Sequence, residues 1–274
     1  MDGTLLFQKV FGLLTGCAIG DAFGIRVEMM HYLDIEEQYG RVDHFEPLPP
    51  RKPSKQPAIE QWQPFGVQPQ NELGYHPLGR WSQSVGAYTD DTRYRLIVYQ
   101  AFLRKQGPIT GRDLAEEWFN YRLRVEGASG TFPTLSWSGP ERAYARLLAS
   151  LDNLTEMVSS QRFCLKGWDA PLGLMYPGRP EEAARIGYSI AVAVATALSR
   201  GATLDAVIAL AGEIMGVIYG AGAFPSAWID QVLQSHPSPD LPQMARDLSA
   251  LISRQALDSQ RAAGQTLTMT GLQA

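Results

Sequence analysis

Apolar residues recur along most of the chain at the three- and four-residue spacing that is typical of buried α-helices. This pattern predicts helices over residues 5–19, 92–103, 112–123, 141–151, 180–200, 204–219, 226–233 and 241–261. Boundary residues support two of them, because Gly107-Pro108 follows the second helix and Pro180 with two acids begins the fifth. Since strand patterns are weak throughout, we expect an all-α fold.

The first predicted helix carries a glycine at every fourth position, namely Gly12, Gly16, Gly20 and Gly24. This spacing keeps the glycines near one face of the helix. A glycine inside a helix costs about 1 kcal/mol relative to alanine, and close approach of another backbone is the usual compensation. We expect this helix to end near Gly20, with residues 21–28 forming a turn.

The chain has 274 residues and no polar linker long enough to divide it. We therefore predict a single domain over residues 1–264 and a flexible polar tail over 265–274. Residues 31–87 differ from the rest, since prolines and aromatic residues interrupt any regular pattern. Long irregular segments of compact domains are often lids or binding loops. A lid and a plain surface excursion both remain open for this segment.

Composition narrows the function classes. With 45% hydrophobic residues the chain can build a globular core, and its net charge of -4 disfavours nucleic-acid binding. Two cysteines, Cys17 and Cys164, are too few for a disulfide framework and suit a reducing cytoplasm. The apolar stretch 10–19 is too short to span a membrane, and the first residues lack the positive charge of a secretory signal. We therefore expect a cytoplasmic protein with no membrane or nucleic-acid partner.

Thr89-Asp90-Asp91-Thr92 is the strongest chemical signal, because adjacent carboxylates repel each other and need water or a cation. A hard divalent cation such as Mg2+ prefers oxygen ligands of this kind. Helix capping is the simpler alternative: Thr89 would cap the helix that follows, and the two acids would favour the positive end of its dipole. Taken alone, this segment favours capping and leaves a metal site open.

A second segment, from Gly12 to Glu28, combines the spaced glycines with Gly20-Asp21-Ala22-Phe23-Gly24. By itself it fits a helix-packing stripe that ends in an Asx turn. Together with the Thr89–Thr92 segment, however, it resembles the ADP-ribosylglycohydrolase family, the family of dinitrogenase reductase-activating glycohydrolase. Further blocks follow in the family's order: Ala170–Gly178, Glu181–Ala184 and Ala211–Gly220, with Pro225 and Trp228 after them.

The resemblance implies an all-α enzyme that holds two divalent cations, commonly Mg2+ or Mn2+. Such an enzyme would hydrolyse the glycosidic bond that joins ADP-ribose to a protein side chain or small acceptor. Carried over by position, Thr89, Asp90 and Asp91 would be metal ligands. Glu28 would close over the site and position water, so that Glu28 and Asp91 would be the catalytic residues. A cation that binds ribose hydroxyls and polarises water, beside carboxylates that offset positive charge on the sugar, suits this hydrolysis.

The chain departs from the family at its second metal-binding block, which in the family reads Gly-Asp-Thr-Asp-Thr. Counting back from Gly212 aligns Asp205 with the second aspartate, whereas Thr203 and Ala206 replace the first aspartate and the last threonine. Deletion of the whole block is the other alignment. The histidines, which are His31, His44, His76 and His236, show no metal-ligand spacing that would fill the gap. We therefore keep open one cation, two or none, and a catalytically degenerate protein that binds ADP-ribose or a nucleotide or has a structural role.

Overall fold

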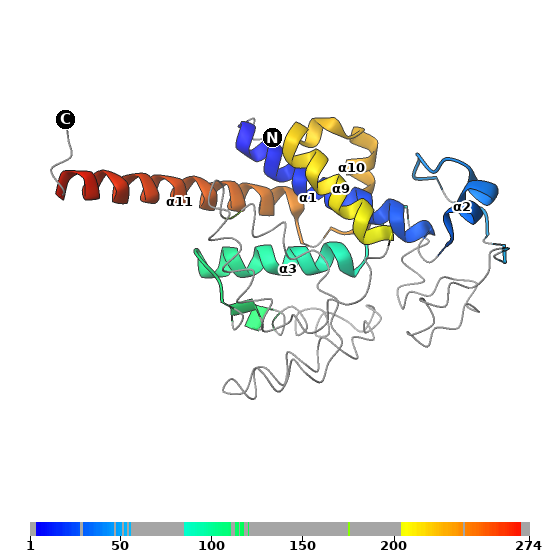
Figure 1. Ribbon diagram of the computed structural model, residues 1–274, viewed down its shortest axis with the longest axis horizontal. Coiled ribbons are helices and arrows are strands. Elements are labelled where there is room, and N and C mark those ends of the chain that lie inside the picture. The colour runs from blue at the N-terminus through cyan, green and yellow to red at the C-terminus, as the bar shows by residue number, and fades with distance from the viewer. Residues whose placement is uncertain are drawn as a thin grey trace.

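The computed structural model describes residues 4–27, 30–46, 48–50, 52–53, 55, 85–110, 113–114, 116–117, 120, 175, 204–237 and 239–269. They form α1 (Leu5–Gly24), α2 (Tyr32–Tyr39), α3 (Asp90–Lys105), α9 (Leu204–Tyr219), α10 (Ser226–Ser235) and α11 (Leu241–Met269), with 3-10 helices η1 (Ile25–Val27) and η4 (Ala221–Ala223) (Figure 1). No strand occurs in these residues, so the all-α prediction is confirmed. The helices predicted over 141–151 and 180–200 lie outside the described residues, as do most of 31–87 and of 112–123.

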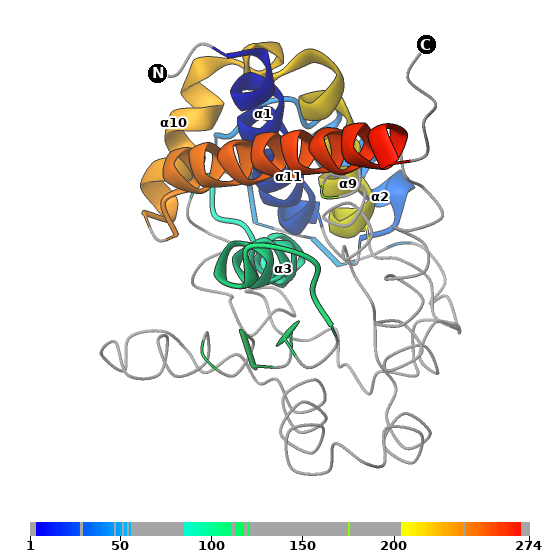
Figure 2. The ribbon, with the colours of Figure 1, turned by 90° about the vertical axis from the view of Figure 1, so that its left-hand side faces the viewer.

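α1 is the central helix of the described core. Thr4 caps it by accepting a hydrogen bond from the backbone N–H of Phe7 (3.2 Å), and apolar residues then occupy nearly every position. α9 lies along α1, with α10 beside them (Figure 1). α11 packs across α1 and also contacts α3, as Figure 2 shows. Because neighbours surround it, α1 is buried along most of its length.

The spaced glycines bring the backbones of α1 and α9 into contact. A Cβ added at Gly16 would lie 2.2 Å from the carbonyl oxygen of Gly212, and one added at Gly20 would lie 2.2 Å from that of Ile208. Real Cβ atoms do not approach other atoms so closely, and no side chain could rotate away to relieve the contact. The close helix approach predicted from the glycine spacing is therefore confirmed.

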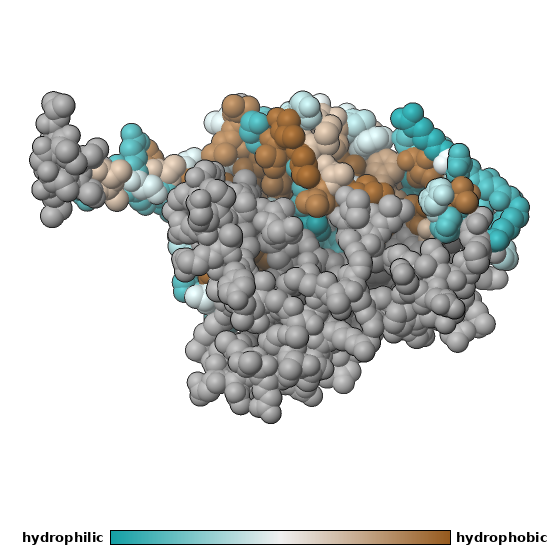
Figure 3. All heavy atoms as spheres, in the orientation of Figure 1, coloured by the Kyte–Doolittle hydropathy of each residue, from teal (hydrophilic) through white to brown (hydrophobic). Residues whose placement is uncertain are grey.

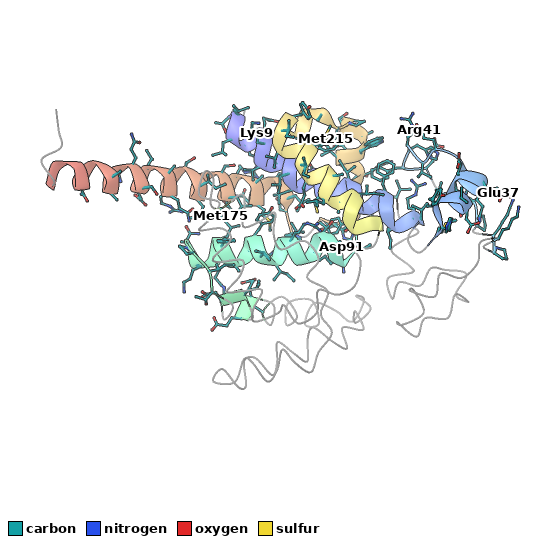
Figure 4. All side chains as sticks on the ribbon, in the orientation of Figure 1. Lys9, Glu37, Arg41, Asp91, Met175 and Met215 are labelled. Atoms are coloured by element: carbon teal, nitrogen blue, oxygen red, sulfur yellow. The ribbon has the colours of Figure 1, made fainter. Side chains whose placement is uncertain are left out.

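Lys9 of α1 forms hydrogen bonds with the C-terminal end of α9. Its ammonium donates hydrogen bonds to the carbonyl oxygens of Val217 (2.9 Å) and Ile218 (3.0 Å), and Figure 4 shows it beside that helix. A positive group at the last carbonyls satisfies acceptors that the helix leaves open and favours the negative end of its dipole. The outer face of α9 keeps apolar side chains on the surface, visible in Figure 3; they include Ile214, Met215, Ile218 and Tyr219.

The predicted end of α1 is wrong. The helix does not stop near Gly20 but continues to Gly24 and into η1, so residues 21–27 are helical instead of forming a turn. The combined helix Leu5–Val27 has the length and composition to cross a membrane and exceeds the apolar stretch 10–19 that the sequence suggested. However, 89% of its most apolar window is buried within the protein, and a core helix meets the same criteria.

Three other helices follow the local signals of the sequence. Thr89 caps α3, which extends two residues beyond each end of the predicted range 92–103. Its C-cap, Gln106, adopts the left-handed conformation (φ 58°) just before Gly107-Pro108. α9 begins and ends at the predicted residues, and α10 runs two residues beyond its predicted end at Leu233. These boundaries are legible because capping residues, glycine and proline act locally.

Two helices differ from the prediction. α11 continues beyond Arg261 to Met269, so Gly264, which costs about 1 kcal/mol relative to alanine, does not end the helix. α2 lies in the segment expected to be irregular, where the His31 side chain caps it by accepting a hydrogen bond from the backbone N–H of Leu33 (3.2 Å). Histidine is a weak sequence signal for a cap, so this short helix left no clear pattern.

Candidate active site

Asp21 of α1 holds the start of α3. Its carboxylate accepts hydrogen bonds from the backbone N–H groups of Thr89 (3.0 Å) and Thr92 (2.9 Å) and from their hydroxyls (2.8 and 2.6 Å). All three residues are buried. Hydrogen bonds to a charged acceptor offset the desolvation of the carboxylate, and the N-terminal end of a helix favours negative charge. The interpretation of Asp21 as part of an Asx turn is therefore wrong, because Asp21 joins two helices.

Thr89 is the N-cap of α3, as the sequence predicted. Its hydroxyl donates to Asp21 Oδ1 and accepts a hydrogen bond from the backbone N–H of Asp91 (3.3 Å). A hydroxyl has one hydrogen and two lone pairs, so these contacts leave one lone pair for a further partner. Capping and metal binding are thus compatible, since one oxygen can do both.

Asp91 lies in the first turn of α3 with its side chain fully buried. Figure 4 shows it at the end of α3 that lies beneath α1 and α9. A buried carboxylate needs positive charge or hydrogen-bond donors nearby. Arg95, one helical turn later, brings a positive charge to this position, because its Nη1 donates a hydrogen bond to the backbone carbonyl of Asp91 (2.8 Å).

Arg95 also forms a buried ion pair with Glu213 of α9, with 2.9 Å between Nε and Oε2. The two side chains are 3% and 2% exposed. Burial acts to lower the pKa of Arg95, but Cys17 in the thiolate form that it takes at high pH, Glu213 and Asp91 together raise it above its usual value. The guanidinium is therefore a permanent charge at the junction of α1, α3 and α9.

Cys17 of α1 lies at the same junction, with its Sγ 3.6 Å from the hydroxyl of Thr92. Burial raises the pKa of the Cys17 thiol well above its usual value, even though Arg95 acts to lower it. The thiol is consequently neutral near pH 7. The carboxylates, and not a thiolate, are the negative charges that Arg95 faces at that pH.

His236 supports the segment that precedes Thr89. Its Nε2 accepts a hydrogen bond from the backbone N–H of Tyr88 (3.1 Å), and the two rings lie with their centroids 3.8 Å apart. Burial, with a smaller effect from Arg93, lowers the pKa of His236 to about 3. The ring is therefore neutral near pH 7, which it must be to accept the hydrogen bond.

The structure places the predicted site residues as follows. Thr89 and Asp91 lie together at the buried start of α3. Asp90 is the first residue of α3 and Asp205 lies in the first turn of α9, but the side chains of both are outside the described part of the structure, and so is the whole of Glu28. The starts of α3 and α9 lie toward the same end of the helical assembly (Figure 1).

The donor chemistry fits a hard divalent cation. The Thr89 hydroxyl and the Asp91 carboxylate are oxygen donors of the kind that Mg2+ and Mn2+ bind. Among the described side chains, no group of three or more His, Cys, Asp or Glu residues lies close enough to hold a metal. A metal site here would need further donors from outside the described side chains, and Asp90, Asp205 and Glu28 are the candidates that the sequence offers.

Sequence reasoning missed Arg95, Glu213 and His236 as neighbours of this site. Arg95 did carry a signal, because it follows Asp91 by four residues and therefore shares a helix face with it. Glu213 was a second signal, as the one charged residue of α9 after its first turn. His236 carried none, since its partner Tyr88 lies 148 positions away in the chain.

Comparison with known proteins bears on the reaction class. The family model of ADP-ribosylglycohydrolase matches residues 2–193. This segment contains α1, α2 and α3 and ends before α9, so that Asp205 lies beyond it. No curated protein matches the chain. Because the match covers well over half of the chain, this protein belongs to the ADP-ribosylglycohydrolase family, and that membership supports a glycohydrolase activity of this general type.

Proposed function

We propose that this protein is a divalent-cation-dependent glycohydrolase that cleaves the bond between ADP-ribose and a protein side chain or small acceptor. The observation that carries the proposal is the buried start of α3, where Asp21 fixes Thr89 beside Asp91. The family match supports the reaction class. We further propose that the protein acts in the cytoplasm, without a membrane or nucleic-acid partner.

In this proposal Thr89, Asp90 and Asp91 hold Mg2+ or Mn2+, with Asp205 as a further ligand. The cation supplies positive charge that orients ribose hydroxyls and polarises water. Thr89 enters the site with its hydroxyl hydrogen committed to Asp21, so its remaining lone pair is available to a cation. The hydrogen bond from the N–H of Asp91 keeps that oxygen in register with the first turn of α3.

The acidic residues divide the hydrolysis between them. Glu28 positions the attacking water and takes its proton as the water oxygen forms a bond to the anomeric carbon. The bond from that carbon to the acceptor breaks, the acceptor leaves with the bonding electrons, and the proton held by Glu28 passes to it. Asp91 offsets the positive charge that develops on the ribose ring as the glycosidic bond breaks. Because its side chain is buried, this charge acts in a medium of low dielectric, where it has a larger effect than in water.

Release of ADP-ribose from an ADP-ribosylated protein, measured with Mg2+ or Mn2+ and again in excess EDTA, tests the proposal. We expect release with metal and none with EDTA. Asp90→Ala and Asp91→Ala should lower the rate by more than the about 10–100-fold that outer-shell partners of a metal contribute. Asp258→Ala, on the exposed surface of α11, is the matched control and should leave the rate unchanged. No turnover of any ADP-ribosyl substrate at saturating metal would contradict the proposal.

A catalytically degenerate protein that binds ADP-ribose or a nucleotide is the second candidate. Residues 202–206 read Ala-Thr-Leu-Asp-Ala and keep a single carboxylate, that of Asp205, where the family pattern has two. A site with fewer charged ligands binds a hard cation less tightly. Calorimetry with ADP-ribose separates the candidates, because binding without hydrolysis favours the degenerate protein and hydrolysis excludes it.

A further inference from the structure

The ion pair between Arg95 and Glu213 brings a second set of charges to the Thr89–Asp91 site. Arg95 lies four residues after Asp91 on α3, so that both side chains are on one face of the helix. Its guanidinium donates one hydrogen bond to the carbonyl oxygen of Asp91 (2.8 Å) and one to the carboxylate of Glu213 (2.9 Å). These two contacts fix the guanidinium between α3 and α9, beside the first turn that carries the candidate ligands.

This arrangement matters for any cation that binds there. A guanidinium cannot lose its proton in a protein, so Arg95 keeps its charge under all working conditions. Water does not screen the charge, because the side chains of Arg95 and Glu213 are 3% and 2% exposed. A fixed positive charge and a divalent cation repel each other more strongly in such surroundings than at the surface.

We propose that Arg95 is an internal cation of the Thr89–Asp91 site, which weakens the binding of a divalent cation beside Asp91, and that Glu213 moderates this effect by balancing the guanidinium. The inference rests on the metal site of the proposed function. Arg95 supplies positive charge that would otherwise come from a second ion. The ion pair thus sets the affinity for the cation and limits the site to one ion per chain.

The two partners of the pair must then act in opposite directions. Removal of the Arg95 charge leaves Asp91 and Glu213 with less compensation, so a divalent cation binds more tightly. Removal of the Glu213 charge leaves Arg95 with less negative charge around it, so a divalent cation binds more weakly. A purely structural ion pair behaves differently, because loss of either partner disturbs the packing of α3 on α9 and weakens binding in both cases.

Titration calorimetry with Mn2+ on the full-length protein tests this inference. The variants are Arg95→Met, Glu213→Gln and the double variant, with circular dichroism to confirm the helical fold. We expect one Mn2+ per wild-type chain, a Kd about fivefold or more lower for Arg95→Met, and a Kd raised by about the same factor for Glu213→Gln. The double variant has the same net charge as the wild type and should bind Mn2+ with nearly the same affinity. Arg254→Met removes an exposed arginine of α11 and should change nothing.

Several outcomes would overturn the inference: weaker binding in both single variants, unchanged affinity in both, or two ions in the wild type. If Arg95→Met does not fold, the double variant is compared with Glu213→Gln, since the two differ only in the Arg95 charge. Tighter binding in the double variant supports the internal cation, and equal or weaker binding contradicts it. If the wild type binds no Mn2+, the proposed metal-dependent function fails. In that case Mn2+ binding by Arg95→Met still supports the internal cation, and its absence overturns it.

Discussion

Oδ1 of Asp21 accepts the hydroxyl hydrogen of Thr89 at 2.8 Å, although 68 positions separate the two residues in the chain. The bond joins the C-terminal part of α1, the central helix, to Thr89, the first candidate ligand of the site. Since α1 is packed against α9 backbone to backbone, its position is closely fixed, and so is that of the Asp21 carboxylate. The rigidity of the site is thus supplied by a helix that provides no candidate metal ligand among its described residues.

Asp21→Ala should therefore destabilise the protein strongly. The substitution leaves the N–H and hydroxyl donors of Thr89 and Thr92 without this buried acceptor. A buried donor that loses its partner costs about 1–3 kcal/mol, and we expect the free energy of unfolding to fall by about 3–5 kcal/mol. Urea denaturation measures the change. Asp258→Ala, which removes an exposed acid, should stay within about 0.5 kcal/mol of the wild type. Equal stability of the Asp21 and Asp258 variants would refute this role for Asp21.

The sequence predicted correctly those helix ends that depend on residues close together in the chain. α9 was predicted with accurate ends and α3 to within two residues at each end, because Thr89, Gly107-Pro108 and the apolar spacing are local signals. The predicted end of α1 was wrong because the true end depends on residues that are distant in the chain. An aspartate in a helix interior is locally unfavourable, and the donors that make Asp21 acceptable there come from α3, which no local pattern links to α1.

The same reason explains what the sequence revealed of the site. The block Thr89-Asp90-Asp91 is contiguous, so its spacing alone made it a candidate. Arg95 and Glu213 are 118 positions apart, and their pairing depends on how α3 and α9 cross. A single sequence contains no direct record of that crossing, so the charge balance of the site became visible only in three dimensions.

Gly16→Ala should disrupt the contact between α1 and α9. The new Cβ would lie 2.2 Å from the carbonyl oxygen of Gly212, and backbone atoms cannot rotate away, so the helices must separate. Overpacking costs about 1–3 kcal/mol where side chains can adjust, and we expect at least the upper end of that range here. Thermal or urea denaturation measures the loss. Gly222→Ala is the control, since nothing lies within 4 Å of its added Cβ. A similar stability for the two variants would show that α1 and α9 are not in close contact.

Cys17 should be unreactive in the folded protein. Its side chain is 2% exposed, and burial raises the pKa of the thiol, so both access and the thiolate form are suppressed. With Cys164→Ser as background, Ellman's reagent should modify Cys17 only after unfolding in concentrated urea. The rate of modification without urea should follow the rate or extent of global unfolding. Rapid modification under native conditions would mean that the junction of α1, α3 and α9 opens locally.

His236 should make the stability of the protein depend on pH below neutrality. Burial and the Arg93 charge lower the pKa of His236 from 6.5 to about 3, so the unfolded chain binds a proton that the folded protein does not. The free energy of unfolding should therefore fall as the pH falls from 6.5 toward 3, by at most about 1.4 kcal/mol per pH unit from this group, while above 6.5 the contribution is constant. His236→Gln keeps an acceptor for the Tyr88 N–H but cannot be protonated. Its stability, measured by urea denaturation at a series of pH values, should decline less steeply than that of the wild type across this window. Parallel pH profiles of the two proteins would show that His236 is not held neutral in the fold.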